Sequence, residues 1–464
     1  MYYLYLTHFL FLVALPKTEL SSIPVRSIIL VGIFLVIFIK YHKKQFFLIP
    51  DKDVFILLLI ISLTGTVNSF LADVSASNIL SGLSRFVIQS YLTFIVTYYF
   101  IIERGVYKTF MPMVYLAALS AVIGFLQFME IDLAWELRST LSSFQTKVTI
   151  LEEMIQQQKR PPGLSLFAIT QGYLLLVFFS VVLLLKKIYR CIGDFEYYFV
   201  LIILFLGIVS SETRSSLVGI LLCYSLIELF GTRIKNIDIK HIRKNQYFAS
   251  TLFSRKTVNR NNTKSTATKF SSLIIIGMVL FLLLLFNKRI TTIDQSASDK
   301  LPLFFYGLYL IKENIFGYGF GFDTTSYAYA FNYFFESNYY SEALLSLAIH
   351  NSLINFIIIY GIVAFVFLLI YLVRISLQSI YFFATIVAYL FLSFFHNAGL
   401  FVGDFYIFYL LALITWIIKS KSVTSNSDTF VHKKPNYKMD TSWYKISQFK
   451  LNTNLKKSKF NLKK

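Results

Sequence analysis

The chain has 464 residues, of which 56% are hydrophobic and 15% are charged, and its mean hydropathy is +0.64. A water-soluble domain carries about 25% charged residues and could not enclose this much apolar surface, so the composition excludes an ordinary soluble protein and indicates one embedded in lipid. In a soluble protein, the formal net charge of +20 would suggest binding to nucleic acid. Here the positive charges are unevenly distributed along the chain, which indicates that they set the orientation in the membrane, and we expect no nucleic-acid partner.

Apolar runs of roughly 15–22 residues recur along the chain, separated by loops that contain charges, glycine or proline. We therefore predict an all-α fold, a polytopic transmembrane helix bundle of about twelve spans with a long extracytoplasmic loop between spans 9 and 10. The predicted spans cover residues 2–15, 24–40, 54–71, 85–102, 109–128, 164–185, 195–211, 215–230, 271–287, 352–373, 377–395 and 400–418.

The distribution of Lys and Arg predicts the orientation. The loop 231–270 carries ten basic residues, and the tail that follows the last span carries twelve. With the short loops on the same side, this face receives 32 of the 44 Lys and Arg residues. Basic residues accumulate on the cytoplasmic side, so we expect both termini in the cytoplasm and the loops 129–163 and 288–350 outside it.

We expect one transmembrane catalytic domain over residues 1–419 and a basic, disordered cytoplasmic tail over residues 420–464. The outer loop before span 10 contains an amphipathic stretch from Leu301 to Asn314, then Gly317-Tyr318-Gly319-Phe320-Gly321 and an aromatic-rich run through Tyr340. A long loop on the translocated side of a compact membrane protein is usually functional.

Five ionisable residues from separate stretches are expected at one depth, on the outer boundary of the membrane. They are Arg160, Arg214, His350, His396 and Asp404. Charged groups at this depth are costly and tend to be functional. Their convergence on one face is therefore the strongest pattern that the residues themselves offer.

Each of these residues also has a purely structural interpretation. Arg160 could extend to headgroup phosphates, and Arg214 could pair with Glu212 in the turn. Asn351 suits the N-cap of a helix, which would leave His350 as an interfacial residue. His396 could lie at a hydrated helix end, and Asp404 could form a hydrogen bond to a neighbouring helix.

Several motifs, in this order, resemble the bacterial O-antigen ligase and O-antigen (polysaccharide) polymerase family of polytopic membrane glycosyltransferases. Arg160-Pro161-Pro162-Gly163 is similar to the family's Arg-x-x-Gly, and Thr213-Arg214-Ser215 to its Thr/Ser-Arg-Ser/Gly turn. Asn314-Ile315-Phe316-Gly317-Tyr318-Gly319 resembles Pro-Leu-x-Gly-x-Gly. His350-Asn351-Ser352-Leu353, followed by Tyr360-Gly361-Ile362, resembles His-Asn-x-x-Leu with its later Gly-Ile/Leu.

The resemblance covers roughly residues 160–373, and the chain departs from the family pattern at three positions. Leu353 comes one residue early, Asn314 replaces proline, and Lys300 stands where arginine is common. These departures bear on the geometry of the loop more than on the class of protein.

The resemblance implies a multi-pass enzyme of the bacterial cytoplasmic (inner) membrane that uses an undecaprenyl-diphosphate-linked oligosaccharide, without cofactor or metal. Arg160 and Arg214 would stabilise the diphosphate leaving group, because guanidinium groups are permanently charged and bind phosphate in a bidentate manner. His350 would accept a proton from the attacking hydroxyl, since histidine changes charge near neutral pH. A single displacement would invert the anomeric carbon.

Eight further positions are expected to bind substrate on this resemblance. They are Asn351, Thr213, Ser215, Gly317, Gly319, Tyr318, His396 and Asp404. We favour polymerisation of capsule, exopolysaccharide or O-antigen repeats; the alternatives are an O-antigen ligase to a lipid core and a polysaccharide-precursor transporter or flippase. Besides the lipid bilayer and the lipid-linked substrate, a chain-length regulator or flippase is an expected partner.

Overall fold

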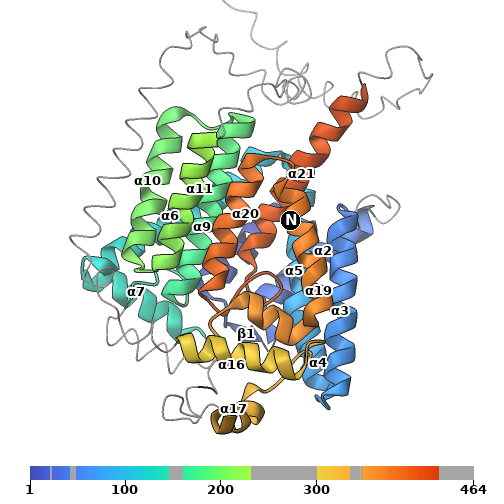
Figure 1. Cartoon of the computed structure of the whole chain (residues 1–464). Coiled ribbons are helices and arrows are strands. Elements are labelled where there is room, and N and C mark those ends of the chain that lie inside the picture. Colours follow the sequence, from blue (N-terminus) through green and yellow to red (C-terminus); the bar gives the residue numbers. More distant parts are fainter. Residues whose placement is uncertain are drawn as a thin grey trace, which may run out of the picture. The chain divides into compact units, whose positions relative to one another are not determined.

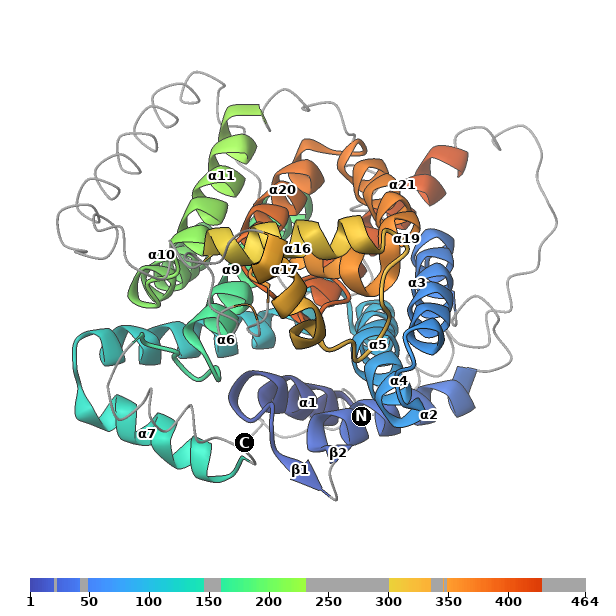
Figure 2. The ribbon, with the colours of Figure 1, turned by 60° about the horizontal axis from the view of Figure 1, so that its bottom comes forward.

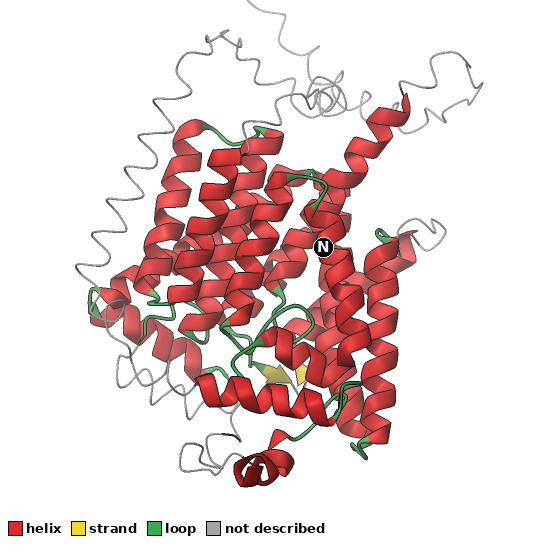
Figure 3. Ribbon diagram, in the orientation of Figure 1, coloured by secondary structure: helices red, strands yellow, loops and turns green. Residues whose placement is uncertain are grey.

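The computed structural model describes residues 1–20, 23–41, 49–145, 160–230, 300–334, 345 and 349–427. The chain divides into two units, Met1–Ile237 with Phe253–Ile418, and Asp238–Leu252 with Lys419–Lys464. The predicted span 271–287 and the basic loop 231–270 lie outside the described residues, as does the tail beyond residue 427. What is described of the first unit is a bundle of helices (Figures 1 and 3).

The first half of the chain folds into helices and one small antiparallel hairpin of strands. Its elements are α1 (Tyr2–Ala14), β1 (Glu19–Leu20), β2 (Ile23–Pro24), α2 (Val25–Tyr41), α3 (Lys52–Leu71), α4 (Ala76–Gly82), the π-helix η2 (Leu83–Ile88), α5 (Gln89–Arg104), α6 (Val106–Phe128), α7 (Asp132–Ser143), α9 (Ala168–Leu184), the π-helix η3 (Leu185–Tyr189), α10 (Asp194–Ser210) and α11 (Arg214–Phe230). A two-residue pairing of Glu19 with Pro24 and Leu20 with Ile23 makes up the hairpin.

The second half adds helices that pack on this framework. They are α16 (Lys300–Glu313), the 3-10 helix η6 (Thr324–Tyr327), α17 (Ala328–Phe334), α19 (Ser352–Ser376), α20 (Ile380–Phe394) and α21 (Tyr406–Ser427). The amphipathic stretch predicted from Leu301 is therefore helical, as α16. It lies across the end of the bundle, where its Phe304 ring is 6.2 Å from that of Phe394 at the end of α20 (Figure 2).

The prediction of an all-α helical bundle is confirmed. Among the residues that the structure describes, five helical segments are long and apolar enough to cross a membrane: Lys52–Leu71, Ala76–Arg104, Val106–Phe128, Ala168–Tyr189 and Ser352–Ser376. Shorter apolar helices cover several other predicted spans, while the total of twelve spans and the orientation stay predictions. A chain with several such helices is a membrane protein, because only lipid can cover the apolar faces that remain outward.

The helix α9 lies at the centre of the bundle. Nearly all of its residues are buried, in contrast to α3, whose outward face is open. A helix that is apolar on all sides must be surrounded by protein or lipid, and α9 is surrounded by α6, α10, α11 and α20. The N-terminal end of α9, which follows the loop after Arg160, is therefore held in place by the surrounding helices.

The helix α19 is broken at Gly361, and a loop from another part of the chain fills the break. Gly361 has a φ of 81°, which interrupts the intrahelical ladder. Three backbone hydrogen bonds join the break to the loop: Tyr318 N–H to Ile358 C=O (2.7 Å), Gly319 N–H to Ile359 C=O (2.9 Å) and Ile362 N–H to Ile315 C=O (2.9 Å). Irregular backbone is tolerated at membrane depth only when such partners satisfy it, so the loop and the break require each other.

Candidate functional site

A hydrogen bond joins the start of α11 to the segment after α20. Ser215 Oγ lies 2.6 Å from Nε2 of His396, and both side chains are buried. One residue before Ser215, Arg214 begins α11 with a half-buried side chain. In the preceding turn, Thr213 Oγ1 and Ser211 Oγ are 2.8 Å apart. The predicted residues Thr213, Arg214 and Ser215 are thus held in one rigid turn that contacts His396.

The same turn packs closely against α9. A Cβ atom at Gly172 would lie 2.9 Å from Thr213 Oγ1 and would overlap Ser216 Oγ. Glycine at this position lets the backbone of α9 approach the first turn of α11, where any side chain would push the helices apart. The beginning of α9 is therefore fixed against the turn that carries Arg214.

The segment that follows Arg160 is fixed to α6. Arg160 is half-buried, and Gly163 has a φ of +61°, where a Cβ would lie 2.5 Å from the carbonyl oxygen of Ser120. Gln127 Oε1 accepts from Gly163 N–H at 2.9 Å, and Ser120 Oγ accepts from Leu164 N–H at 2.9 Å. These polar groups replace the helical ladder, so α9 begins at Ala168 rather than at the predicted residue 164.

A buried arginine connects this segment to two other helices. Arg138 of α7 is fully buried, and its Nη1 donates to the carbonyl oxygens of Leu164 (2.8 Å) and Ala14 (2.9 Å). Burial lowers the pKa of Arg138 to about 10, so the guanidinium stays charged at neutral pH. Arg138 is not among the residues predicted from the sequence, although a charged residue on the buried face of an amphipathic helix is a recognisable signal.

The predicted residues at the start of α19 lie beside the end of α20. Asn351 is the N-cap of α19, and its Oδ1 accepts from two backbone N–H groups of the first turn at 3.0 Å each. His350, which precedes it, is half-buried. Ser352 Oγ donates to the carbonyl oxygen of Ser393 at 2.9 Å, three residues before His396. The structure thus brings His350 and His396 to the same end of the bundle through α19 and α20.

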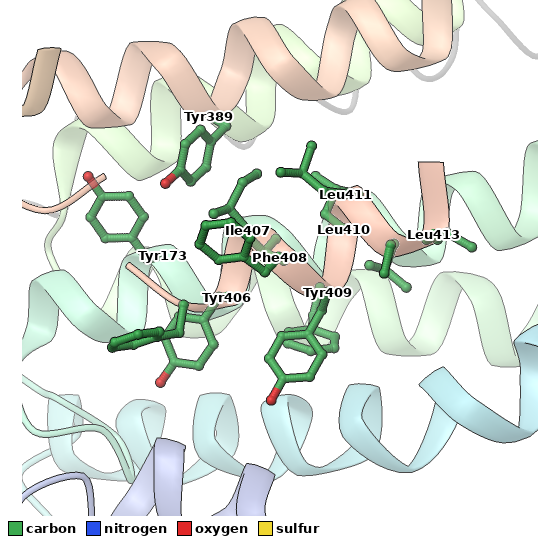
Figure 4. Close-up of a cluster of buried hydrophobic side chains, with 14 of the residues drawn as sticks. Tyr173, Tyr389, Tyr406, Ile407, Phe408, Tyr409, Leu410, Leu411 and Leu413 are labelled. Atoms are coloured by element: carbon green, nitrogen blue, oxygen red, sulfur yellow. The ribbon is translucent and has the colours of Figure 1, made fainter. Parts of the chain in front are cut away.

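A series of contacts through two tyrosines, Tyr389 and Tyr173, connects Asp404 to His396. Asp404 Oδ2 accepts from Tyr389 OH at 2.8 Å and its Oδ1 from Tyr406 N–H at 2.9 Å. The ring of Tyr173 lies 5.8 Å from that of Tyr389 (Figure 4). It also lies 6.1 Å from the ring of His396. Both oxygens of Asp404 therefore contact protein groups, which matches the interpretation of this residue as a link to neighbouring helices.

Gly317, Tyr318 and Gly319 lie apart from this cluster of contacts, between α3 and the break in α19. Asn68 Nδ2 donates to the carbonyl oxygen of Phe316, and Tyr318 OH donates to that of Leu310 at 3.0 Å. A cavity of about 590 Å³ lies beside the loop. It is lined by Asn68, Leu71, Ala72, Glu313, Asn314, Phe316, Gly317, Tyr318 and Tyr327. The backbone groups of the loop hold α19 in its broken shape, and the cavity beside them is open to a ligand.

Besides Arg138, the polar residues that fix the segment between Arg160 and α9 were not predicted from the sequence. Gln171 Oε1 accepts from Ser120 Oγ at 2.7 Å and from Ser165 Oγ at 2.9 Å, and Gln127 contacts both the N–H and the C=O of Gly163. A glutamine inside an apolar run was the available signal, because polar side chains in spans are costly and have partners. Comparison of the chain with family models, curated proteins and solved structures finds no match.

Proposed function

We propose that this chain is a glycosyltransferase that acts on undecaprenyl-diphosphate-linked oligosaccharides at the outer face of the bacterial cytoplasmic membrane. Within this class we favour a polymerase of saccharide repeats over a ligase to a lipid core. The observation that carries the proposal is the contact between Ser215 and His396, which places Arg214 at the end of the bundle where α19 begins with His350 and Asn351. A permanent cation and two imidazoles at the same end of the bundle support this proposal.

The leaving group in such a reaction is a lipid diphosphate, and its negative charge grows as the glycosidic bond breaks. Arg214 is the first residue of α11. The free N–H groups of a helix's first turn and the positive end of the helix dipole both favour an anion at this end of the helix. Arg160 lies three residues before Gly163, whose backbone is fixed to α6 just ahead of α9. Preorganised positive groups of this kind stabilise the transition state without having to move during the reaction.

The nucleophile is a hydroxyl group of the acceptor sugar. As the bond from its oxygen to the anomeric carbon forms, the bond from that carbon to the diphosphate oxygen breaks, and the hydroxyl proton passes to His350. The proton leaves afterwards to solvent, and the diphosphate departs as the anion, so the step balances between the donor and the acceptor sugar alone. Proton acceptance by a positioned histidine contributes about 10²–10⁴ in rate.

The direct test is a reconstituted reaction. The purified chain in liposomes would receive a single lipid-linked repeat, and products would be separated by length. Arg214→Gln and Arg160→Gln should abolish chain extension while the melting temperature stays within about 2–4 °C of the wild type, because both side chains are only half-buried. Lys108→Gln, an exposed basic residue of α6, is the matched control and should retain full extension.

The outcomes separate the proposed classes. Products several repeats long identify a polymerase. In a parallel reaction that also contains a lipid core, transfer of one oligosaccharide to that core with no chain growth identifies a ligase. Full-length polymer from either arginine variant would overturn the assigned roles. If the chain is instead a transporter, cells that lack it should accumulate the precursor in the inner leaflet, whereas loss of a polymerase leaves single repeats in the outer one.

A further inference from the structure

Another cavity, with basic residues in its lining, lies outside the site described above, between α2 and the continuous segment α4–η2–α5. Its volume is about 820 Å³, and the hairpin β1–β2 borders it. Three basic side chains line it, Lys17, Arg26 and Arg85, against a single acidic one among the described lining residues, the exposed Glu19. The charge of the lining is therefore positive, which favours an anion.

Two residues that line this cavity each have a buried hydrogen-bond donor with no acceptor among the described residues. These donors are Nε of Arg26 and the hydroxyl of Ser27, both enclosed by the protein. The guanidinium carbon of Arg26 lies 4.7 Å from the centre of the Phe405 ring, so stacking fixes the group without satisfying its N–H donors. A buried donor without a partner is costly, and a bound acceptor would remove that cost.

Arg85 lines the cavity from the side opposite Arg26. It lies in the π-helix η2, and it is roughly 13 Å along the helical segment from Ala76 by the rise per residue. Its side chain is exposed on a segment that is apolar enough to cross a membrane. π-helical turns occur often at functional sites, and an exposed arginine at this depth is expensive unless it contacts an anion or water.

The other end of the cavity is apolar and open. Ile28, Val31 and Leu35 are exposed on one face of α2, and Ile88 is exposed across from them. Between them Gly32 leaves a gap, since a Cβ atom there would meet no heavy atom within 4 Å. The cavity thus combines a basic end, beside two buried donors without acceptors, with a groove of exposed apolar side chains.

We infer that this cavity binds a lipid with a phosphate-bearing headgroup. The phosphate would contact Arg26, Ser27 and Arg85, and the acyl or prenyl chain would lie in the groove over Gly32. The inference does not depend on the proposed reaction, because it shares no residue with the site around His396. Arg26 stacks on Phe405, the neighbour of Asp404, so a headgroup bound here would lie next to the loop that enters α21.

The test measures lipid retention by the full-length chain with native mass spectrometry after exchange into detergent. Four probes are offered separately: a polyprenyl diphosphate, phosphatidylglycerol, phosphatidylcholine and inorganic pyrophosphate. The wild type should retain one of the two anionic lipids over phosphatidylcholine. Arg85→Gln alone, on an exposed side chain, should weaken retention on the order of tenfold, and Arg26→Gln with Arg85→Gln should weaken it further.

A second variant tests the groove. Gly32→Phe should block lipid retention while leaving pyrophosphate binding intact, and Gly193→Leu, which also meets open space, is the control that should retain lipid. Preference for the polyprenyl diphosphate would identify a carrier lipid, and equal retention of both anionic lipids would identify bulk phospholipid. Retention that is unchanged in Arg85→Gln and Gly32→Phe, or equal for phosphatidylcholine, would overturn the inference whatever reaction the chain catalyses.

Discussion

The hydroxyl of Ser215 lies 2.6 Å from Nε2 of His396, a contact between positions 181 residues apart in the chain. It fixes the start of α11, with Arg214, to the segment that leaves α20. Because both partners are buried, neither can exchange this bond for one to water. The contact therefore contributes to the stability of the bundle as well as to the geometry of the proposed site.

Ser215→Ala should lower the free energy of unfolding by about 1–3 kcal/mol, because it leaves a buried imidazole nitrogen without its partner. The measurement is thermal unfolding in detergent, compared with Ser143→Ala, an exposed serine whose loss should change stability by less than about 0.5 kcal/mol. If the two residues act as a pair, the double variant Ser215→Ala with His396→Ala should cost less than the sum of the two single changes. Strict additivity would mean that the contact contributes nothing by itself.

His350 and Asn351 are neighbours that should behave differently on substitution. Removal of a general base costs about 10²–10⁴ in rate, so His350→Ala should lose turnover with its melting temperature unchanged. Asn351→Ala removes the N-cap of α19 and should cost about 0.5–2 kcal/mol of stability. Turnover of purified protein and thermal unfolding of the same samples give both quantities. Activity of His350→Ala within a few-fold of the wild type would make that residue structural.

The glycines that hold the loop in the break of α19 should tolerate no side chain. A Cβ at Gly361 would lie 2.5 Å from the carbonyl carbon of Phe316, and one at Gly319 would lie 2.5 Å from Cα of Ser69. Both also have positive φ, which costs an L-residue about 1–2 kcal/mol. Gly361→Ala and Gly319→Ala should therefore lower the melting temperature clearly.

Gly32→Ala supplies the control for these two variants. It lies inside α2 and its Cβ would meet nothing, so the substitution should leave stability unchanged or raise it by up to about 1 kcal/mol. Equal melting temperatures for Gly32→Ala and Gly319→Ala would show that the loop does not need its close approach to α3.

The helices could be predicted from the sequence because their signal is local. A run of apolar residues long enough to cross lipid folds as a helix wherever it lies, and Asn351 has the side chain that caps one. The boundaries were less predictable. The segment Ala76–Arg104 begins nine residues before the predicted span 85–102, since its first turns carry Ser, Asn and Gly and are less apolar.

The breaks in the helices depend on tertiary partners and had no local signal. Gly361 lies in an apolar run that predicts an unbroken helix, and only the loop that carries Gly317 and Gly319 makes the break stable. Likewise, the non-helical stretch before Ala168 exists because Ser120 and Gln127 of another helix satisfy its backbone. The motifs indicated which segments are unusual, but not that the glycine loop would contact α3 and α19 rather than the residues near His396.

Arg138 offers a test of how the segment after Arg160 is supported. Its Nη1 joins α7 to the carbonyl oxygens of Ala14 and Leu164, so Arg138→Ala would leave both without this donor and open a cavity in the interior. Large-to-small changes at buried sites cost about 2–5 kcal/mol, and the loss of the donor to Leu164 C=O adds to this cost, whereas Ala14 C=O keeps the bond from Gln145 Nε2. We expect a large fall in the melting temperature in detergent. Glu136→Ala, an exposed residue on the same helix, is the control and should unfold like the wild type, because its side chain faces outward. Equal stability of Arg138→Ala and Glu136→Ala would show that α7 is not what holds Leu164, and that the backbone around Gly163 is fixed by α6 alone.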